Sequence, residues 1–109
     1  MKAKQFGLRE SDLKSIVKVL SQFDTINEAV LFGSRAKGNY KQGSDVDIAL
    51  KGDIDIRTVA KVSYLLNQES LMPYRFDIVN YAGIKHQALK DHIDRVGVTI
   101  YQNNLRKSA

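Results

Sequence analysis

The chain has 109 residues, which is the size of one domain. Hydrophobic residues make up 43% and charged residues 27%, close to globular averages, so a packed core is expected rather than disorder. Cysteine is absent, which excludes a disulfide framework, a zinc ribbon and a cysteine nucleophile and is consistent with a reducing cytoplasm. The formal net charge of +5 indicates an anionic partner without distinguishing phosphates, nucleic acid or an acidic protein.

No segment of the sequence has the length or composition of a membrane span. The longest purely apolar run, Ala29–Phe32, is far too short to cross a bilayer, and the first residues lead into no signal-peptide core. Repeats, low-complexity tracts and Pro/Gly/Ser-rich linkers are also absent. We therefore expect one soluble, cytoplasmic domain over 1–109, with an ordered core at about 6–102, a basic polar tail at 103–109 and no membrane partner.

The first elements follow from the spacing of apolar residues. A helix is predicted from Ser11, taken as its N-cap, because apolar side chains then recur at helical spacing to Leu20. A short apolar segment at 28–32 ends at Gly33, which is typical of a buried strand. The next strand is predicted at 45–50, where alternation places one set of side chains on each face. The first set is Val46, Ile48 and Leu50, and the second is Asp45, Asp47 and Ala49.

The second half of the chain repeats the alternation of helices and strands. Helical spacing recurs at 54–67, a strand is predicted at 74–79, a helix at 84–95 and a last strand at 98–101. The order α-β-β-α-β-α-β predicts an α/β (α+β) fold, a small mixed sheet of about four strands with helices packed against it.

The glycine-containing segment after the first strand has the residue types of a phosphate site. Gly33 ends the strand without a side chain, so a phosphate can approach the backbone there. Ser34 offers a hydroxyl and begins what reads as a short helical turn. Arg35 and Lys37 add positive charge as candidate triphosphate contacts, with solvated surface charges as the alternative.

The next strand delivers two carboxylates on one face. Asp45 and Asp47 are two residues apart, so they lie side by side and repel one another unless a cation neutralises them. Mg²⁺ prefers a few carboxylates together with substrate phosphate oxygens. Asp77 lies in the third strand between two apolar residues and is the candidate third ligand.

Simpler interpretations exist for each acidic residue. In the simpler interpretation, Asp45 and Asp47 are ordinary surface acids at a solvent-facing strand edge, and Asp77 forms a salt bridge with Arg75 or another basic residue. A second Asp-x-Asp, at 53–55, lacks a Gly-Ser at the right distance and is interpreted as a loop and a helix cap. His86 and His92 are six residues apart, which does not align them as metal ligands on one helix face, so we expect surface or partly buried side chains.

The spacing of these residues resembles a known signature. Gly33-Ser34, ten further residues and then Asp45-x-Asp47 resembles the DNA polymerase β-type nucleotidyltransferase superfamily. The chain is most similar to the minimal nucleotidyltransferases, the MntA-like antitoxins encoded beside HEPN-domain proteins. The resemblance runs from about Phe6 to Tyr101 and includes the strand that carries Asp77.

The resemblance implies a role for each matched residue. Gly33 and Ser34 would hold the β- and γ-phosphates of a nucleoside triphosphate, most often ATP, with Ser44 added to the nucleotide-binding set. Asp45 and Asp47 would bind two Mg²⁺ ions. Asp77 would complete the metal site and activate the incoming hydroxyl, so that the acceptor oxygen attacks the α-phosphorus and pyrophosphate leaves.

The resemblance also implies a partner. Larger members of the superfamily carry a C-terminal domain that shapes the acceptor site, so in this chain the partner is expected to supply the acceptor. In the MntA-like group the partner is a HEPN ribonuclease toxin, and the antitoxin transfers AMP to a tyrosine near the toxin's active site. We expect the same of this chain, as the antitoxin of a type VII-like pair.

Three alternatives stay open at this point. The chain could neutralise its partner by occlusion alone, without catalysis. It could adenylylate a small hydroxyl compound, as the longer aminoglycoside nucleotidyltransferases do. Direct nucleic-acid binding is the least expected alternative, because no helix-turn-helix, RRM or KH pattern is present.

Overall fold

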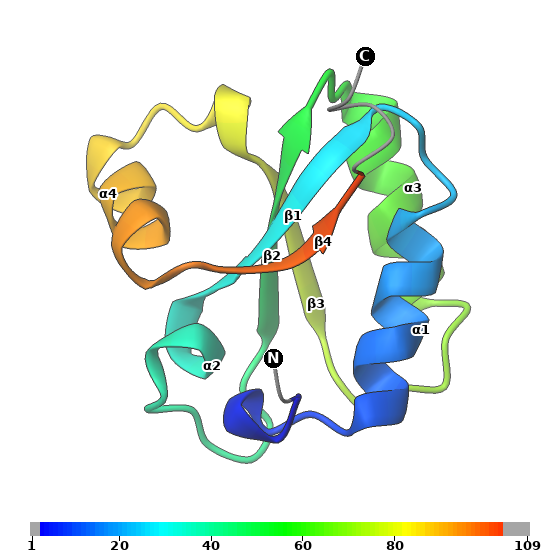
Figure 1. The fold of residues 1–109 in the computed structure, drawn as a ribbon, viewed down its shortest axis with the longest axis vertical. Coiled ribbons are helices and arrows are strands. Elements are labelled where there is room, and N and C mark those ends of the chain that lie inside the picture. Colours follow the sequence, from blue (N-terminus) through cyan, green and yellow to red (C-terminus); the bar gives the residue numbers. More distant parts are fainter. Residues whose placement is uncertain (1–2, 104–109) are drawn as a thin grey trace.

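Four strands form one mixed sheet in the order β3-β2-β1-β4 (Figure 1). The computed structural model describes residues 3–103. The strands are β1 (Ile26–Phe32), β2 (Val46–Gly52), β3 (Phe76–Asn80) and β4 (Val98–Gln102). The helices are α1 (Glu10–Leu20), α2 (Gly33–Lys37), α3 (Ile56–Asn67) and α4 (Gln87–Val96), with short 3-10 turns η1 (Ala3–Phe6) and η2 (Tyr81–Gly83).

The strand pairings explain how distant segments meet. β1 runs antiparallel to both β2 and β4, whereas β2 and β3 are parallel. A parallel pair needs a crossover, and α3 supplies it between β2 and β3. In this register Asp47 lies opposite Phe32 on one side and opposite Asp77 on the other.

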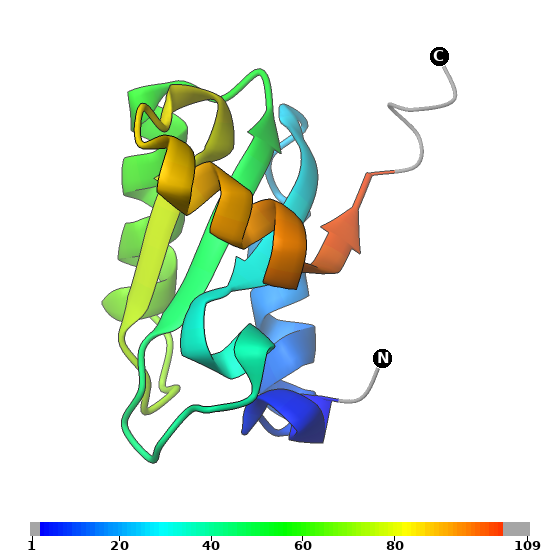
Figure 2. The ribbon, with the colours of Figure 1, turned by 90° about the vertical axis from the view of Figure 1, so that its left-hand side faces the viewer.

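The two faces of the sheet carry separate cores. The larger core lies under α1 and α3 and includes Ile16, Leu20, Leu31, Val46, Ile48, Leu50, Val62, Leu66, Phe76 and Ile78. The smaller core lies under α4 and consists of Val30, Phe32, Ala49 and Ile93. Figure 2 shows α4 crossing one face of the sheet, α1 and α3 behind it, and α2 beside α4 at the end of β1. The predicted fold class and the predicted division of β2 into two faces are therefore confirmed.

The start of the first helix differs from the prediction. Ser11 lies inside α1, and Arg9 occupies the N-cap position instead. The carboxylate of Asp12 accepts a hydrogen bond from the Arg9 amide at 3.0 Å, so a side chain three residues ahead satisfies a backbone donor at the helix start. By contrast, Asp55 caps α3 as expected and accepts the Thr58 amide at 2.8 Å.

The expectations about membrane spans and about the polar tail can be compared with the structure only over the residues that it describes. Within residues 3–103, no helix has the length and apolarity needed to span a membrane. The predicted polar tail lies outside the described residues from position 104 onward, and the single domain over 1–109 stays a prediction.

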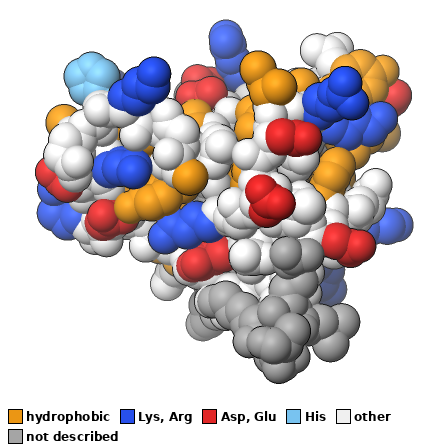
Figure 3. Space-filling model, turned by 90° about the horizontal axis from the view of Figure 1, so that it is seen from above, with side chains coloured by type: hydrophobic (Ala, Val, Ile, Leu, Met, Phe, Trp, Pro, Cys, Tyr) orange, Lys and Arg blue, Asp and Glu red, His pale blue; other side chains and the backbone are white. Residues whose placement is uncertain are grey.

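Charges of both signs are mixed on the end of the molecule that is uppermost in Figure 1. Figure 3 views that end, and basic side chains there are interspersed with acidic ones. Nucleic-acid-binding surfaces gather basic residues into a patch or stripe. This face therefore gives the nucleic-acid alternative no support.

Candidate functional site

Two aspartates stand side by side where β2 and β3 run parallel. Asp47 and Asp77 are register partners, and both lie on the face that α4 partly covers. Asp47 is half-buried and Asp77 is exposed. Asp45 is also exposed and comes just before β2 begins at Val46. The strand register thus agrees with the predicted shared side for Asp47 and Asp77, whereas Asp45 precedes the paired residues and its place on that side stays a prediction.

The carboxylate of Asp47 is in an environment that disfavours its charge. Burial raises the pKa of Asp47, and the nearby charges of Asp77 and Asp45 raise it further, to about 6, although Arg35 acts in the opposite direction. Among residues 3–103, the negative charge at this position thus outweighs the opposing effect of Arg35.

The donor set fits a hard divalent cation in its chemistry. Carboxylate oxygens are the ligands that Mg²⁺ prefers, and the raised pKa of Asp47 shows that added positive charge would be favourable there. Within the described residues, however, no three His, Cys, Asp or Glu side chains converge as a metal-binding group. The candidate ligands that the structure brings near one another are the strand-paired Asp47 and Asp77, together with Asp45, whose charge also acts on Asp47.

The Gly-Ser segment lies directly against this acidic pair. Gly33 begins α2 with a φ of +74°, a conformation that side chains disfavour. A Cβ at Gly33 would overlap Oδ2 of Asp47, so only glycine lets the backbone approach that carboxylate. Ser34 follows and is half-buried. The predicted phosphate-binding residues and two of the predicted metal ligands are thus brought to one place.

Arg35 does not point toward this site as a free cation. Its side chain is only 3% exposed, and its guanidinium donates to the carbonyls of Phe6 at 2.8 Å, Gly7 at 3.3 Å and Ser44 at 2.8 Å. Its Cζ also lies 5.4 Å from the Tyr40 ring centroid and 5.0 Å from that of Tyr74. Arg35 therefore holds the segment at Phe6 and Gly7 and the turn at Ser44 together. The expected triphosphate contact has no support in this geometry.

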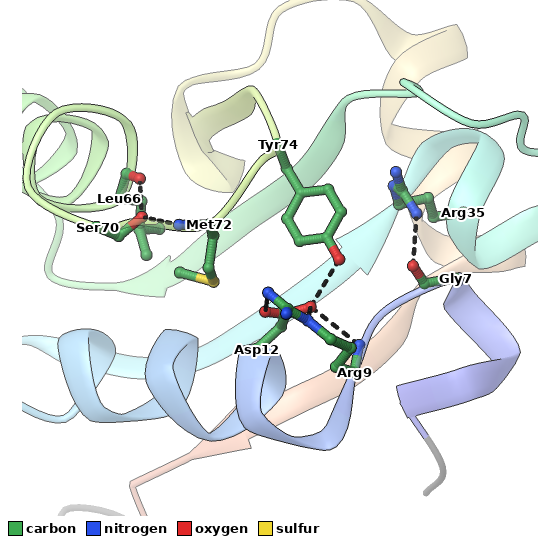
Figure 4. Close-up of polar contacts among 8 residues, drawn as sticks. All are labelled: Gly7, Arg9, Asp12, Arg35, Leu66, Ser70, Met72 and Tyr74. Atoms are coloured by element: carbon green, nitrogen blue, oxygen red, sulfur yellow. Dashed lines mark hydrogen bonds and ion pairs between the residues drawn. The ribbon is translucent and has the colours of Figure 1, made fainter.

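A second group of polar contacts, separate from the Arg35–Gly7 hydrogen bond, lies at the start of α1 (Figure 4). The hydroxyl of Tyr74 donates to Asp12 at 2.6 Å, and the Arg9 guanidinium donates to the same carboxylate at 2.9 Å. Burial opposes ionisation of Asp12, but the hydrogen bonds from Arg9 and Tyr74 outweigh it and hold its pKa below the ordinary value. The network ties α1 to the segment that leads into β3 and Asp77.

The other two expected nucleotide contacts have different surroundings. The Ser44 hydroxyl accepts the Lys41 amide at 2.8 Å and so closes the turn that precedes Asp45. Lys37 is exposed in the last turn of α2. Ser44 therefore stabilises the turn before the carboxylates, and a role of Lys37 in binding the nucleotide stays a prediction.

One residue at the site was not assigned a role from the sequence. Nε2 of His92, on α4, accepts the backbone N–H of Gly33 at 3.1 Å. The two residues are 59 positions apart, so no local pattern links them. Lone histidines on a helix carry little information, and only the fold shows that this one reaches the Gly-Ser segment.

Comparison with known families gives a direct match. The sequence model of the family described as Polymerase beta, Nucleotidyltransferase matches residues 14–106, which is most of the chain. That match includes both parts of the Gly-Ser and Asp-x-Asp signature. A comparison with curated proteins gives no significant match.

Solved structures share the fold at low sequence identity. One is a crystal structure of a toxin–antitoxin with AMP-PNP, 19% identical, which covers 88% of this chain and 77% of its own at a TM-score of 0.70. Another contains a tri-AMPylated Shewanella oneidensis HEPN toxin in complex with MNT antitoxin (17% identity, 91% and 76% coverage, TM-score 0.66). An MntA–HepT toxin–antitoxin structure gives 16% identity, 92% and 78% coverage and a TM-score of 0.65. The expected nucleotidyltransferase fold is thereby confirmed.

Proposed function

Because the chain belongs to the polymerase beta nucleotidyltransferase family, we propose that it transfers AMP from ATP to a hydroxyl group of a protein partner. The partner proposed is a HEPN-domain ribonuclease toxin, the acceptor is one of its tyrosines, and the chain acts as the antitoxin. Support for the nucleotide and the partner comes from structures of the same fold, one with AMP-PNP and one with a tri-AMPylated HEPN toxin.

The observation that carries the proposal is the pairing of Asp47 with Asp77 beside Gly33. In the proposed reaction the acceptor oxygen attacks the α-phosphorus and pyrophosphate leaves. Gly33, which has no side chain, lets the β- and γ-phosphates come close to the backbone, and Ser34 donates hydrogen bonds to them. The exposed Asp77 accepts the proton of the acceptor hydroxyl. Bound Mg²⁺, held by Asp45, Asp47 and Asp77, would supply charge neutralisation and polarisation of the phosphate oxygens.

The accessibility of the site supports a large acceptor. Asp45 and Asp77 are both exposed, and Asp77 lies on β3, a strand at the edge of the sheet. A protein loop can therefore reach the carboxylates without passing through a narrow channel. A small-molecule acceptor would instead need an enclosing pocket to orient it.

The test is transfer of label from α-³²P-ATP to a co-purified HEPN-domain protein in the presence of Mg²⁺. Wild type is expected to label the partner, whereas γ-³²P-ATP should leave it unlabelled because pyrophosphate departs. The double variant Asp45→Asn/Asp47→Asn should lose at least a hundredfold of the rate. Asp53→Asn, in the second Asp-x-Asp, is the matched control and should label at the wild-type rate. Equal labelling by the double variant would refute the assignment of these carboxylates.

A second candidate function is neutralisation by binding alone. The observation that favours it is that no three potential metal ligands converge within residues 3–103. The same variants separate the two functions. If Asp45→Asn/Asp47→Asn protects against the toxin as well as wild type does, and no label moves with either protein, occlusion is the function.

A further inference from the structure

A hydrogen bond joins α4 to the Gly-Ser segment. The Gly33 amide donates to Nε2 of His92 at 3.1 Å. The imidazole ring also lies edge-on against Phe32, with ring centroids 6.2 Å apart and an interplanar angle of 80°. His92 thus contacts two consecutive residues where β1 ends and α2 begins, and these two contacts fix the orientation of its ring.

The surroundings of His92 make it a rigid support. The next residue, Ile93, is buried in the core under α4 together with Phe32. His92 itself is half-buried. A side chain held by its helix on one side and by Phe32 on the other loses little further freedom when it accepts a hydrogen bond, so the bond restrains Gly33 effectively.

The conformation of Gly33 is important because its backbone lies against the carboxylate of Asp47. Its backbone has a φ of +74° and lies against Oδ2 of Asp47 with no room for a Cβ. A small rotation of this peptide would change both the spacing to Asp47 and the direction of the Ser34 amide that follows. The amide of Gly33 is already used by His92, so phosphate contacts in this segment fall to Ser34 and the residues after it.

We propose that His92 is a positioning residue of the nucleotide site, acting through the Gly33 peptide. The proposal rests on the proposed function, since it assumes that the Gly33–Ser34 segment receives a triphosphate. As the acceptor, Nε2 carries no proton, and the ring proton resides on Nδ1. His92 touches neither the phosphates nor the acceptor; it sets the backbone that does.

The chain offers matched variants for the test. His92→Gln places an amide oxygen near the position of Nε2 and keeps an acceptor for the Gly33 amide, whereas His92→Leu keeps the packing on Phe32 and removes the acceptor. His86→Leu is the control, because His86 is exposed at the other end of α4. Each variant of the 109-residue chain is titrated with Mg·ATP, and its unfolding temperature is measured with and without the nucleotide.

His92→Leu is expected to weaken Mg·ATP binding about tenfold, the equivalent of one lost hydrogen bond, while His92→Gln stays within about threefold of wild type. His86→Leu should bind like wild type. A merely structural role would lower the unfolding temperature of free His92→Leu but leave its shift on adding Mg·ATP unchanged, and that result would overturn the proposal.

Direct observation of the hydrogen bond between Gly33 and His92 distinguishes failure of the positioning role from failure of the proposed function. In the ¹⁵N-labelled wild-type chain, a scalar coupling across the bond between the Gly33 amide nitrogen and Nε2 of His92 is expected, and its absence would refute the contact even if His92→Leu failed to fold. Wild type that shows the coupling but binds no Mg·ATP would instead refute the proposed function, and the positioning role with it. Wild type that binds Mg·ATP while His92→Leu binds equally well would refute the positioning role alone.

Discussion

The backbone of Gly33 is packed against the carboxylate of Asp47, so that a side chain of any size at Gly33 would overlap Oδ2 of Asp47. Gly33 directly follows the end of β1, and Asp47 lies near the start of β2, a strand that pairs antiparallel with β1. The contact brings the first residue of the Gly-Ser segment to the half-buried member of the aspartate pair. The sheet register and the absence of a Cβ therefore set the spacing between the two parts of the proposed site.

Gly33→Ala is expected to lower the free energy of unfolding by about 2–3 kcal/mol, because alanine disfavours a φ of +74° and its Cβ meets Asp47. Gly43→Ala is the matched control, with a φ of +90° and open space around its Cβ, and should cost only about 1 kcal/mol. Urea unfolding measures both. In an Asp47→Ala background the overlap is relieved, and Gly33→Ala should then cost no more than the control. A cost for Gly33→Ala that does not change with Asp47 would contradict the contact.

The raised pKa of Asp47 predicts that this residue makes the protein less stable as pH rises. Its pKa moves from 3.8 to about 6 on folding, so between these values the folded state holds the proton more tightly than the unfolded chain. Stability therefore falls as pH increases through this window, by about 1 kcal/mol once the screening of a half-buried carboxylate is allowed for. Asp47→Asn, which cannot ionise, should be about 1 kcal/mol more stable than wild type at pH 7.5 and indistinguishable from it near pH 4.

Unfolding at the two pH values checks this prediction. Asp53→Asn serves as the control for removal of one carboxylate charge, because Asp53 is exposed in the loop after β2. Mg²⁺ at millimolar concentration should stabilise wild type at pH 7.5 and have a much smaller effect on Asp47→Asn. The explanation fails if Asp47→Asn is the less stable protein at pH 7.5.

The acidic part of the site could be predicted because it depends on alternation and spacing. The alternation along 45–50 places Asp47 on the face of the sheet that points away from the larger core. Phe76 and Ile78 point into that core, so Asp77, which lies between them, is on the same face as Asp47 once the two strands pair. Family membership could be predicted from the same residues. Their roles as ligands stay predictions, since a shared face does not by itself bring three carboxylates together.

The positions of His92 and Arg35 could not be predicted, because they depend on contacts between residues far apart in the sequence. His92 meets Gly33 across 59 positions, and Arg35 meets Phe6 across 29. Arg35 stands in a segment whose composition indicates phosphate binding, yet the fold turns its side chain toward protein carbonyls. A sequence shows that a charge is available, whereas burial and tertiary hydrogen bonds decide what the charge pairs with.

Arg35→Met is expected to lower the free energy of unfolding by about 3 kcal/mol, because the carbonyls of Phe6, Gly7 and Ser44 lose their donor while the aliphatic volume is kept. Arg35→Lys should recover only part of the loss, because one ammonium cannot reproduce the planar guanidinium between two rings. Lys37→Met, at the exposed end of α2, is the control and should stay within about 0.5 kcal/mol of wild type. An Arg35→Met protein as stable as wild type but deficient in Mg·ATP binding would reinstate the phosphate contact.

Tyr74→Phe removes the hydroxyl that donates to Asp12 at 2.6 Å and should cost about 1–2 kcal/mol, because Asp12 is only 2% exposed and water cannot replace the lost donor. The pKa of Asp12 is held below its ordinary value, so its contribution to stability is present at neutral pH and is lost as the pH falls and the carboxylate protonates. The difference between Tyr74→Phe and wild type should therefore narrow in acid. Tyr64→Phe is the matched control: its hydroxyl donates to Glu69 at 3.1 Å on the surface, and its loss should cost less than about 0.5 kcal/mol. Urea unfolding at pH 7.5 and pH 3.5 separates the cases. An equal cost for the two tyrosine variants at pH 7.5 would show that the hydrogen bond from Tyr74 to the buried Asp12 does not stabilise the start of α1.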